Sequence, residues 1–238
     1  MQTKKILGIT LSLRTLRESL SYSDYLMKNS ALSTVHHITT RMLVQASKQP
    51  EIKNLLEKTD MLICAEADIL RAAGITSGAR QYEIDNHLFL KEQCRHIRRE
   101  QGSFYLLSDT EETLSKLNAL LAEYLGSDFS ATCQSLDKLR GSDDVLVPEN
   151  LANELNDIAP TIIISNIPFP YQLQLMQDLK PFLNARMWFG LPSDLSVLTK
   201  RRVSVFRKLK EKYFKKKVHQ YQEPIPEENS SDSSTSAS

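Results

Sequence analysis

The stretch Thr161-Ile162-Ile163-Ile164-Ser165 constrains the fold more than any other part of the sequence. It carries no charge, and its β-branched side chains favour an extended backbone. A strand that is apolar on both faces is typical of a parallel sheet covered by helices on both sides. Weaker runs of the same kind lie at 5–11, 35–40, 61–64, 103–107 and 185–189.

Segments with apolar residues at helical spacing separate these runs. Pro50 falls inside one of them and predicts that a new helix begins there. We therefore predict an α/β fold with a Rossmann-like, mostly parallel sheet and helices on both faces. The helical segments are 15–29, 41–58, 69–73, 85–101, 109–125, 148–158 and 170–183, whereas 130–144 is only weakly patterned.

The composition is that of an ordinary soluble globular protein, with 41% apolar residues, 25% charged residues and a net charge of +1. Cys64, Cys94 and Cys133 lie far apart, and none forms a metal-type pair. We therefore expect a reducing compartment, no metal site and no cofactor. The sequence contains no run of eighteen apolar residues, so we expect a cytoplasmic protein.

The composition changes after residue 198. Residues 200–219 are dominated by Lys and Arg, with apolar side chains near helical spacing among them. From residue 223 the chain is acidic and then rich in serine, and such a segment buries too little apolar surface to become ordered. We predict an α/β domain at 1–198, a basic amphipathic helix at 199–222 and a disordered tail at 223–238.

Acidic side chains directly follow one of the predicted strands. The apolar residues 61–64 are succeeded by Ala65-Glu66-Ala67-Asp68, in which two acids are spaced by one alanine. The carboxyl ends of parallel strands form the rim at which α/β proteins bind ligands. Glu66 and Asp68 are therefore candidate site residues, although the local sequence alone favours Asp68 as a helix N-cap.

Several stretches, taken in order, resemble one known family. They are Lys5-Ile6-Leu7-Gly8-Ile9, Ala46-Ser47-Lys48-Gln49-Pro50-Glu51-Ile52, Phe104-Tyr105-Leu106-Leu107 and Ala159-Pro160-Thr161-Ile162-Ile163-Ile164 followed by Pro170-Tyr171-Gln172. These stretches are similar to the opening strand, the approach to the catalytic Asp-Gly, the central strand and the Pro-Lys-Gln-Glu turn of the WecB/TagA/CpsF family of bacterial glycosyltransferases (glycosyltransferase family 26). The resemblance covers residues 5–207.

The resemblance implies transfer of an N-acetylhexosamine of the N-acetylmannosamine type from a UDP-sugar donor to a lipid-pyrophosphate-linked acceptor, in cell-surface polysaccharide synthesis. The implied partners are the UDP-sugar, the lipid-linked glycan and an anionic membrane surface, at the inner face of the cell membrane. A homo-oligomer is compatible with the resemblance, and nucleic acid is the least favoured partner. Such a reaction needs a base for the acceptor hydroxyl and cations or donors for the departing diphosphate.

Carried over residue by residue, the resemblance places the family's catalytic Asp-Gly on Ala65-Glu66. Glu66 and Asp68 are then the tentative replacements for the missing base, whose loss alone lowers the rate by roughly a hundred- to ten-thousand-fold. The positions that the resemblance implies for substrate binding are Thr39, Arg80, Asp85, Gln172 and Asp194.

These residues also have purely local interpretations. Arg80 would form a surface pair with the acid five residues later, while Gln172 and Asp194 would cap turns. The functional interpretation instead predicts that Thr39, Asp68, Arg80 and Gln172 surround one hollow at the ends of the strands.

The basic segment has three interpretations. It is a solvated helix covering the body, a helix that attaches to anionic lipid, or a nucleic-acid-binding helix. The resemblance favours the second, because the implied acceptor lies in a membrane. The candidate membrane-binding residues are Arg201, Arg202, Phe206, Arg207, Lys208, Tyr213 and Phe214.

The leading interpretation is a peripheral membrane glycosyltransferase of this family. Because alanine occupies the base position, the first alternative is a catalytically degenerate member that binds a nucleotide-sugar, a glycolipid or a partner enzyme without turnover. The second alternative is a Rossmann-like protein whose basic helix binds nucleic acid.

Overall fold

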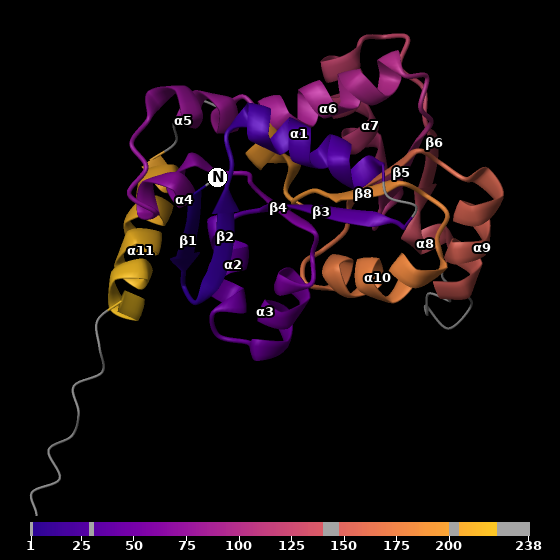
Figure 1. Cartoon of the computed structure of the whole chain (residues 1–238). Coiled ribbons are helices and arrows are strands. Elements are labelled where there is room, and N and C mark those ends of the chain that lie inside the picture. Colours follow the sequence, from indigo (N-terminus) through magenta and orange to yellow (C-terminus); the bar gives the residue numbers. More distant parts are fainter. Residues whose placement is uncertain (1, 29–30, 140–147, 200–204, 223–238) are drawn as a thin grey trace, which may run out of the picture.

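The computed structural model describes residues 2–28, 31–139, 148–199 and 205–222. Its centre is a six-stranded sheet in which all neighbouring strands are parallel (Figure 1), which confirms the predicted fold class. In spatial order the strands are β4 (Met61–Cys64), β3 (Ser33–Ile38), β8 (Met187–Gly190), β7 (Ile162–Asn166), β5 (Phe104–Ser108) and β6 (Thr132–Ser135).

Helices cover both faces of this sheet (Figure 1). One layer consists of α1 (Leu16–Met27), α6 (Leu88–Arg99) and α7 (Glu111–Leu125), and the other of α8 (Leu136–Leu139), α9 (Pro148–Ile158), α10 (Tyr171–Leu179) and the 3-10 turn η1 (Lys180–Phe182). Ile162 and Ile164 of β7 pack in the core of the first layer, whereas Ile163 packs in the core of the second. Successive strand residues point to opposite faces, so the isoleucine run needs a helix layer on each side.

A third apolar core lies at the β4 edge of the sheet. Its helices are α2 (Thr40–Ala46), α3 (Pro50–Glu57), α4 (Ala67–Ala72) and the C-terminal α11 (Val205–Gln222). The break between α2 and α3 falls at Pro50, as predicted, because proline fits the first turn of a helix but not its interior.

The N-terminal run 5–11 is not a strand of the parallel sheet, which corrects the prediction. It folds into a separate antiparallel hairpin of β1 (Gln2–Ile6) and β2 (Ile9–Leu13). Leu7 and Gly8 turn the chain with φ of 51° and 78°, the backbone that a tight hairpin requires. A Cβ atom on Gly8 would collide with the hydroxyl oxygen of Tyr221, so the end of α11 packs on this turn.

Two other segments differ from the sequence pattern. The helix predicted over 85–101 corresponds to α6, which begins later, at Leu88, because Asp85 ends the preceding α5 (Gly78–Asp85) and His87 adopts a left-handed φ of 52° between them. The weakly patterned segment 130–144 contains the edge strand β6 and the short helix α8 within its described part. An edge strand has one neighbour and needs less apolar sequence than a central strand.

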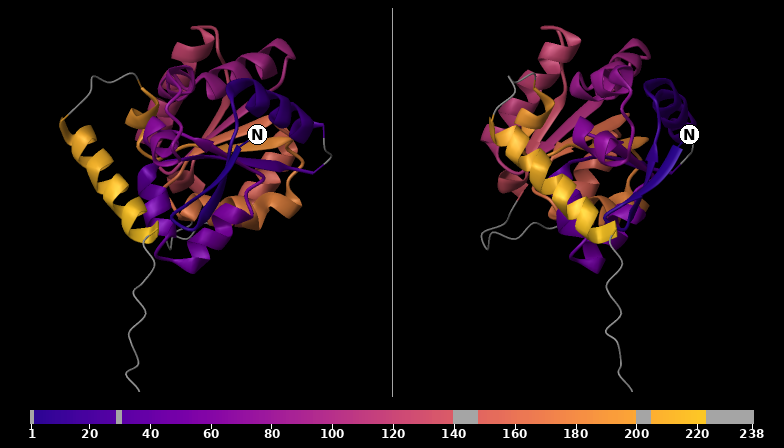
Figure 2. Two further views of the ribbon diagram at one scale, coloured as in Figure 1. Left: turned by 60° about the vertical axis from the view of Figure 1, so that its left-hand side comes forward. Right: turned by 90° about the vertical axis from the view of Figure 1, so that its left-hand side faces the viewer.

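The C-terminal helix α11 packs along the outside of the α2 and α4 region (Figure 2). Phe214 is 1% exposed and Val218 is 6% exposed, one helical turn apart on the same face. Arg71 of α4 forms an ion pair with Glu211 of α11, with 3.4 Å between Nε and Oε1. Among the described residues, no helix is both long enough and apolar enough to span a bilayer. The predicted disordered tail at 223–238 lies outside the described residues.

Candidate active site at the carboxyl edge of the sheet

The carboxyl ends of four strands bring their following loops to one side of the molecule. A cavity of about 440 Å³ lies there, and we call it the Thr39 pocket. Its walls come from the segments after β3, β4, β7 and β8 and from α11. The polar residues that line it are Thr39, Thr40, Arg41, Gln45, Glu66, Ser193, Asp194 and Lys210, together with Tyr213.

Thr39 and Glu66 lie at adjacent strand ends in this pocket. Thr39 is the N-cap of α2, and its hydroxyl accepts a hydrogen bond of 3.3 Å from the Met42 backbone N–H. The Glu66 carboxylate accepts one of 2.6 Å from the Thr40 backbone N–H. This bond joins the loop after β4 to the loop after β3. It therefore holds a carboxylate at the wall of the pocket.

Ala65, on which the sequence resemblance places the family's catalytic aspartate, is buried at 3% exposure. Its backbone N–H continues the ladder to Ile38 at 2.8 Å. Glu66 then leaves the strand as the N-cap residue of α4, with φ and ψ of −133° and 131°. The carboxylate therefore reaches the pocket from the residue after the strand end.

Asp68 lies outside the lining of the Thr39 pocket. It is 7% exposed, sits in the first turn of α4 rather than at its N-cap, and pairs with Arg71. Arg71 in turn contacts Glu211 of α11. Asp68 thus belongs to an ion-pair chain between two helices.

Gln172 lies behind the pocket and is fully buried. Its Oε1 accepts hydrogen bonds from the Ser165 hydroxyl at 3.0 Å and from the Ile167 backbone N–H at 2.9 Å. Its Nε2 lies 3.0 Å from Nε2 of His36 and donates to the Leu191 carbonyl at 3.0 Å. The amide therefore ties together the ends of β3, β7 and β8. It positions the loops that form the pocket.

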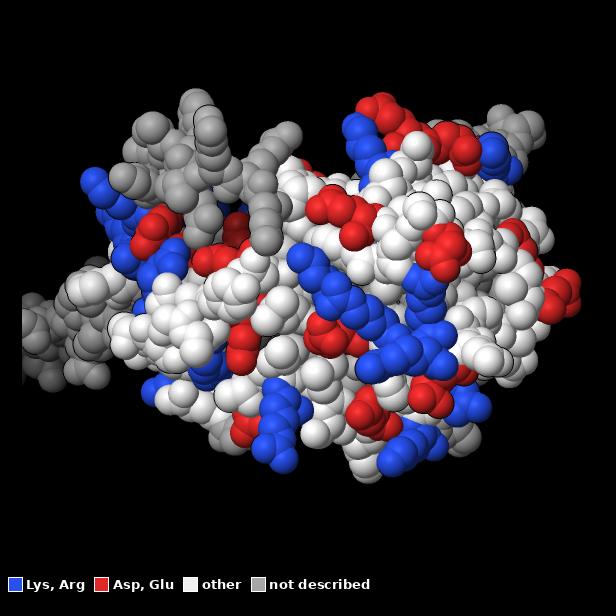
Figure 3. Space-filling view, turned by 90° about the horizontal axis from the view of Figure 1, so that it is seen from above, with Lys and Arg blue, Asp and Glu red and all other residues white. Residues whose placement is uncertain are grey.

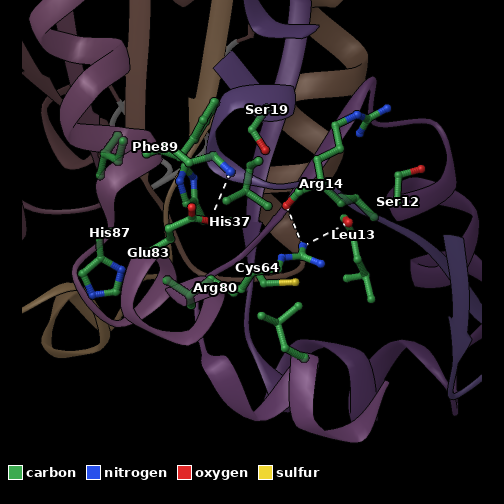
Figure 4. A pocket seen from close by; sticks show the side chains of 16 residues that line it. Ser12, Leu13, Arg14, Ser19, His37, Cys64, Arg80, Glu83, His87 and Phe89 are labelled. Carbon is green, nitrogen blue, oxygen red and sulfur yellow. Dashed lines mark hydrogen bonds between the residues drawn. The ribbon is translucent and has the colours of Figure 1, made fainter. Parts of the chain in front are cut away.

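Arg80 lines a different and smaller cavity, of about 50 Å³ (Figure 4). Its Nη2 donates to the carbonyl oxygens of Leu13 at 3.0 Å and Arg14 at 2.7 Å. The neighbouring Glu83 accepts a hydrogen bond of 3.1 Å from the Leu16 backbone N–H. Both side chains therefore hold the junction between the hairpin and α1.

Burial favours the neutral forms of His37, His87 and Cys64, which line this smaller cavity. It lowers the pKa of His37 to about 3, with a further contribution from the nearby His36 and His87, and that of His87 to about 4. It raises the pKa of the Cys64 thiol to about 12. Neutral imidazoles and an un-ionised thiol supply neither a cation nor a nucleophile at neutral pH.

The remaining predicted substrate-binding residues lie apart from each other. Asp194 lines the Thr39 pocket and caps the 3-10 turn η2 (Leu195–Leu198), accepting a 3.0 Å hydrogen bond from the Ser196 N–H. Asp85 is the last residue of α5 and lines neither the Thr39 pocket nor the smaller cavity. Thr39, Glu66 and Asp194 are thus brought together with Gln172 behind them. Arg80 and Asp68 do not share that hollow, which corrects the predicted arrangement.

The predicted membrane-binding residues divide into three groups. Arg201 and Arg202 lie outside the described residues, and Phe206, Arg207 and Lys208 lie on the helix, where only the backbone is described. Tyr213 is 52% exposed, but Phe214 is buried in the third core. Phe214 is therefore not available for insertion into a bilayer, which corrects that assignment.

Two cations of the Thr39 pocket are absent from the sequence-based predictions. Arg41 follows Thr39 by two residues, so a cation next to a strand end was a signal that the sequence contained. Lys210 enters from α11, about 170 residues later in the chain, and no local pattern indicates that contact. Together they give the pocket the positive groups that a diphosphate requires.

A pocket at the carboxyl edge of a parallel sheet is the site at which α/β proteins bind nucleotides. The family model described as the glycosyl transferase WecG/TagA/CpsF family matches residues 4–220, from β1 into α11. The chain belongs to this family of glycosyltransferases. Among the curated proteins no match was found.

Proposed function

We propose that this protein binds a UDP-sugar in the Thr39 pocket and transfers an N-acetylhexosamine of the N-acetylmannosamine type to a lipid-pyrophosphate-linked acceptor. The observation that carries the proposal is the pocket of about 440 Å³ at the carboxyl edge of the sheet, inside the matched family region. It combines two cations with polar groups from three strand ends. Arg41 and Lys210 are the groups that would hold the diphosphate.

Glu66 is the carboxylate that best fits the role of general base. In the proposed step, Glu66 takes the proton of the acceptor hydroxyl, the hydroxyl oxygen forms a bond to the anomeric carbon, and UDP leaves with the electrons of the broken bond. The Thr40 N–H fixes the Glu66 carboxylate at the pocket wall. Asp68 is already paired with Arg71 and is buried away from the pocket.

A second function is favoured by alanine at residue 65, where the resemblance implies the family's catalytic aspartate, and this alanine is buried. A chain without a competent base would bind a nucleotide-sugar, a glycolipid or a partner enzyme without turnover. The two functions share the pocket and differ in whether sugar is transferred.

The outer face of α11 is the part of the described chain that suits an anionic membrane surface. Lys212, Tyr213, Lys215 and Lys216 are exposed, while Phe214 holds the helix to the body. Lysine side chains near such a surface contribute about 1 kcal/mol each. This arrangement would place the Thr39 pocket, which α11 borders, beside a lipid-linked acceptor.

The sequence places the nucleic-acid alternative on the basic C-terminal helix, and the face over α1, α6 and α7 adds no further support for it. Figure 3 shows Lys and Arg interleaved with Asp and Glu there. Arg95 pairs with Glu92 at 2.6 Å and Lys116 pairs with Glu112 at 2.5 Å. Nucleic-acid binding depends on unpaired cations gathered in a patch or stripe.

The direct test of the donor site is a calorimetric titration of UDP and UDP-N-acetylmannosamine into the protein and two charge-reversed variants. Arg41→Glu places an acid in the pocket, whereas Lys48→Glu makes the same change at an exposed position outside its lining. We expect Arg41→Glu to lower the affinity for both ligands at least tenfold and Lys48→Glu to leave both affinities unchanged. Equal affinities for the two variants would contradict the assignment of the pocket.

A further inference from the structure

A second hollow lies on the other side of the loop that carries Asp194. It has a volume of about 640 Å³, and we call it the α7 groove because α7 forms one wall. Ser193 and Asp194 line both the α7 groove and the Thr39 pocket. The two hollows are therefore neighbours that share one wall. The polar residues that line the groove are Thr113, Lys116, Glu123, Asn166, Ser193, Asp194, Ser196 and Thr199.

Asn166, at the carboxyl end of β7, gives this groove an unused hydrogen-bond donor. The residue is 1% exposed, and its Oδ1 accepts a hydrogen bond from the Ser108 hydroxyl. Its buried Nδ2 has no hydrogen-bond partner among the described residues. Buried polar groups are nearly always paired, so an unpaired amide N–H beside a hollow indicates an acceptor supplied from outside the protein.

The charges of the groove favour a neutral, hydroxyl-rich ligand. Glu123 and Asp194 are acids, and Lys116 is already paired with Glu112. Carboxylates accept hydrogen bonds from hydroxyl groups but repel phosphates. The Thr39 pocket has the opposite character, because Arg41 and Lys210 line it.

We propose that the α7 groove is a sugar-binding subsite, in which Asn166 Nδ2 donates to an oxygen of a hexosamine ring substituent. Its link to the Thr39 pocket rests on the proposed function, since a sugar in the groove and a diphosphate in the pocket would meet at Asp194. The sugar has two sources with the same chemistry, the donor and the lipid-linked acceptor. Both present hydroxyl and acetamido oxygens, and the experiment separates them.

Three variants of the full-length protein test this subsite. Asn166→Asp keeps the acceptor for Ser108 and replaces the donor by an acceptor, and Asn118→Asp is the same change at an exposed position of α7 outside the groove. Ala119→Trp fills the groove from the exposed face of α7 and does not disturb the core, so it tests the proposal even where Asn166→Asp unfolds the protein.

The probes are UDP, UDP-N-acetylmannosamine, the methyl glycoside of N-acetylglucosamine and a short lipid-pyrophosphate-linked N-acetylglucosamine. We expect Asn166→Asp and Ala119→Trp to weaken the binding of at least one sugar-bearing probe about tenfold and to leave the affinity for UDP unchanged. We expect Asn118→Asp to change none of these affinities. If the groove variants lose affinity for UDP-N-acetylmannosamine, the groove binds the donor sugar. If they lose affinity only for the methyl glycoside and the lipid-linked N-acetylglucosamine, the groove binds the acceptor sugar.

The outcomes separate this inference from the proposed function. If UDP binds and every sugar-bearing probe binds the groove variants as it binds the parent protein, the subsite is overturned and the donor site stands. If UDP does not bind but the methyl glycoside does, with its affinity lost in Ala119→Trp, the subsite stands and the donor site fails. If no sugar-bearing probe binds the parent protein, the subsite is overturned.

Discussion

Gln172 donates a side-chain N–H to Nε2 of His36 across 3.0 Å, in a place where both side chains are fully buried. The direction of this bond follows from the other ring nitrogen. Nδ1 of His36 lies 3.2 Å from the carbonyl oxygen of His37, which can only accept, so Nδ1 carries the hydrogen. Nε2 is then an acceptor, and the imidazole is neutral. All four hydrogen-bonding positions of the Gln172 amide are used.

Replacing Gln172 by leucine removes this junction. We expect the free energy of unfolding to fall by about 3 kcal/mol or more, because buried donors and acceptors at three strand ends lose their partner. Gln174→Leu is the matched control, since Gln174 lies exposed on the same helix. Urea unfolding of both variants measures the difference. Similar losses would show that Gln172 does not organise the strand ends.

Gly190 packs directly against the Gln172–His36 hydrogen bond. A Cβ atom at this position would lie 2.8 Å from both Gln172 Nε2 and His36 Cδ2. We expect Gly190→Ala to destabilise the fold by about 1–3 kcal/mol through overpacking. Gly78→Ala, at a helical position with no atom within 4 Å, should be neutral or stabilising. Thermal unfolding that ranks the two variants the other way would contradict the packing described here.

Acid should destabilise the protein before most of its carboxylates titrate. Burial lowers the pKa of His36 to about 4, of His37 to about 3 and of His87 to about 4. The unfolded chain takes up these protons near pH 6.5, whereas the folded chain takes them up only below about pH 4. The contribution of these histidines to the free energy of unfolding is therefore at its maximum above pH 6.5, and it is lost as the pH falls toward 4.

Urea unfolding between pH 7.5 and 4.5 measures this dependence. His37→Phe should reduce the slope, because it removes one of the three groups and places a ring between Phe89 and Phe189. His219→Gln, an exposed position on α11, should leave the slope unchanged. A flat profile for the parent protein would show that these histidines are not buried and neutral.

The third core depends on the C-terminal helix. Phe214→Ala removes a side chain that is 1% exposed and should lower the free energy of unfolding by about 3–5 kcal/mol. Tyr213→Ala, one residue earlier and 52% exposed, should change it by less than about 1 kcal/mol. Chemical unfolding distinguishes the two. Equal effects would show that α11 is not docked as described.

The strands and helices of the layered fold are easier to predict from the sequence than the residues of the candidate active site. The strand at Ile162–Asn166, the new helix at Pro50 and the helix at Pro148–Ile158 follow from local chemistry, namely β-branched runs and proline placement. The separate hairpin does not, because a short apolar run has no feature that reports its neighbours. Its turn at Leu7 and Gly8 shows only in the backbone angles.

Only those site residues that directly follow a predicted strand can be placed at the site from the sequence. Thr39, Glu66 and Asp194 meet because each follows a strand of the same sheet, and parallel strands end at the same edge. Arg80 and Asp68 lie on helices, and their partners, Leu13 and Arg14 for Arg80 and Arg71 for Asp68, are set by packing. Lys210 reaches the pocket only because α11 docks.

The most direct measurement is sugar transfer from UDP-N-acetylmannosamine to a lipid-pyrophosphate-linked N-acetylglucosamine by the parent protein, Glu66→Gln and Asp68→Asn. Glutamine retains the acceptor for the Thr40 N–H but is not a base. We predict that Glu66→Gln binds the donor and loses roughly a hundred- to ten-thousand-fold in kcat, while Asp68→Asn transfers sugar at close to the parent rate. Transfer by Glu66→Gln at the parent rate would contradict the account.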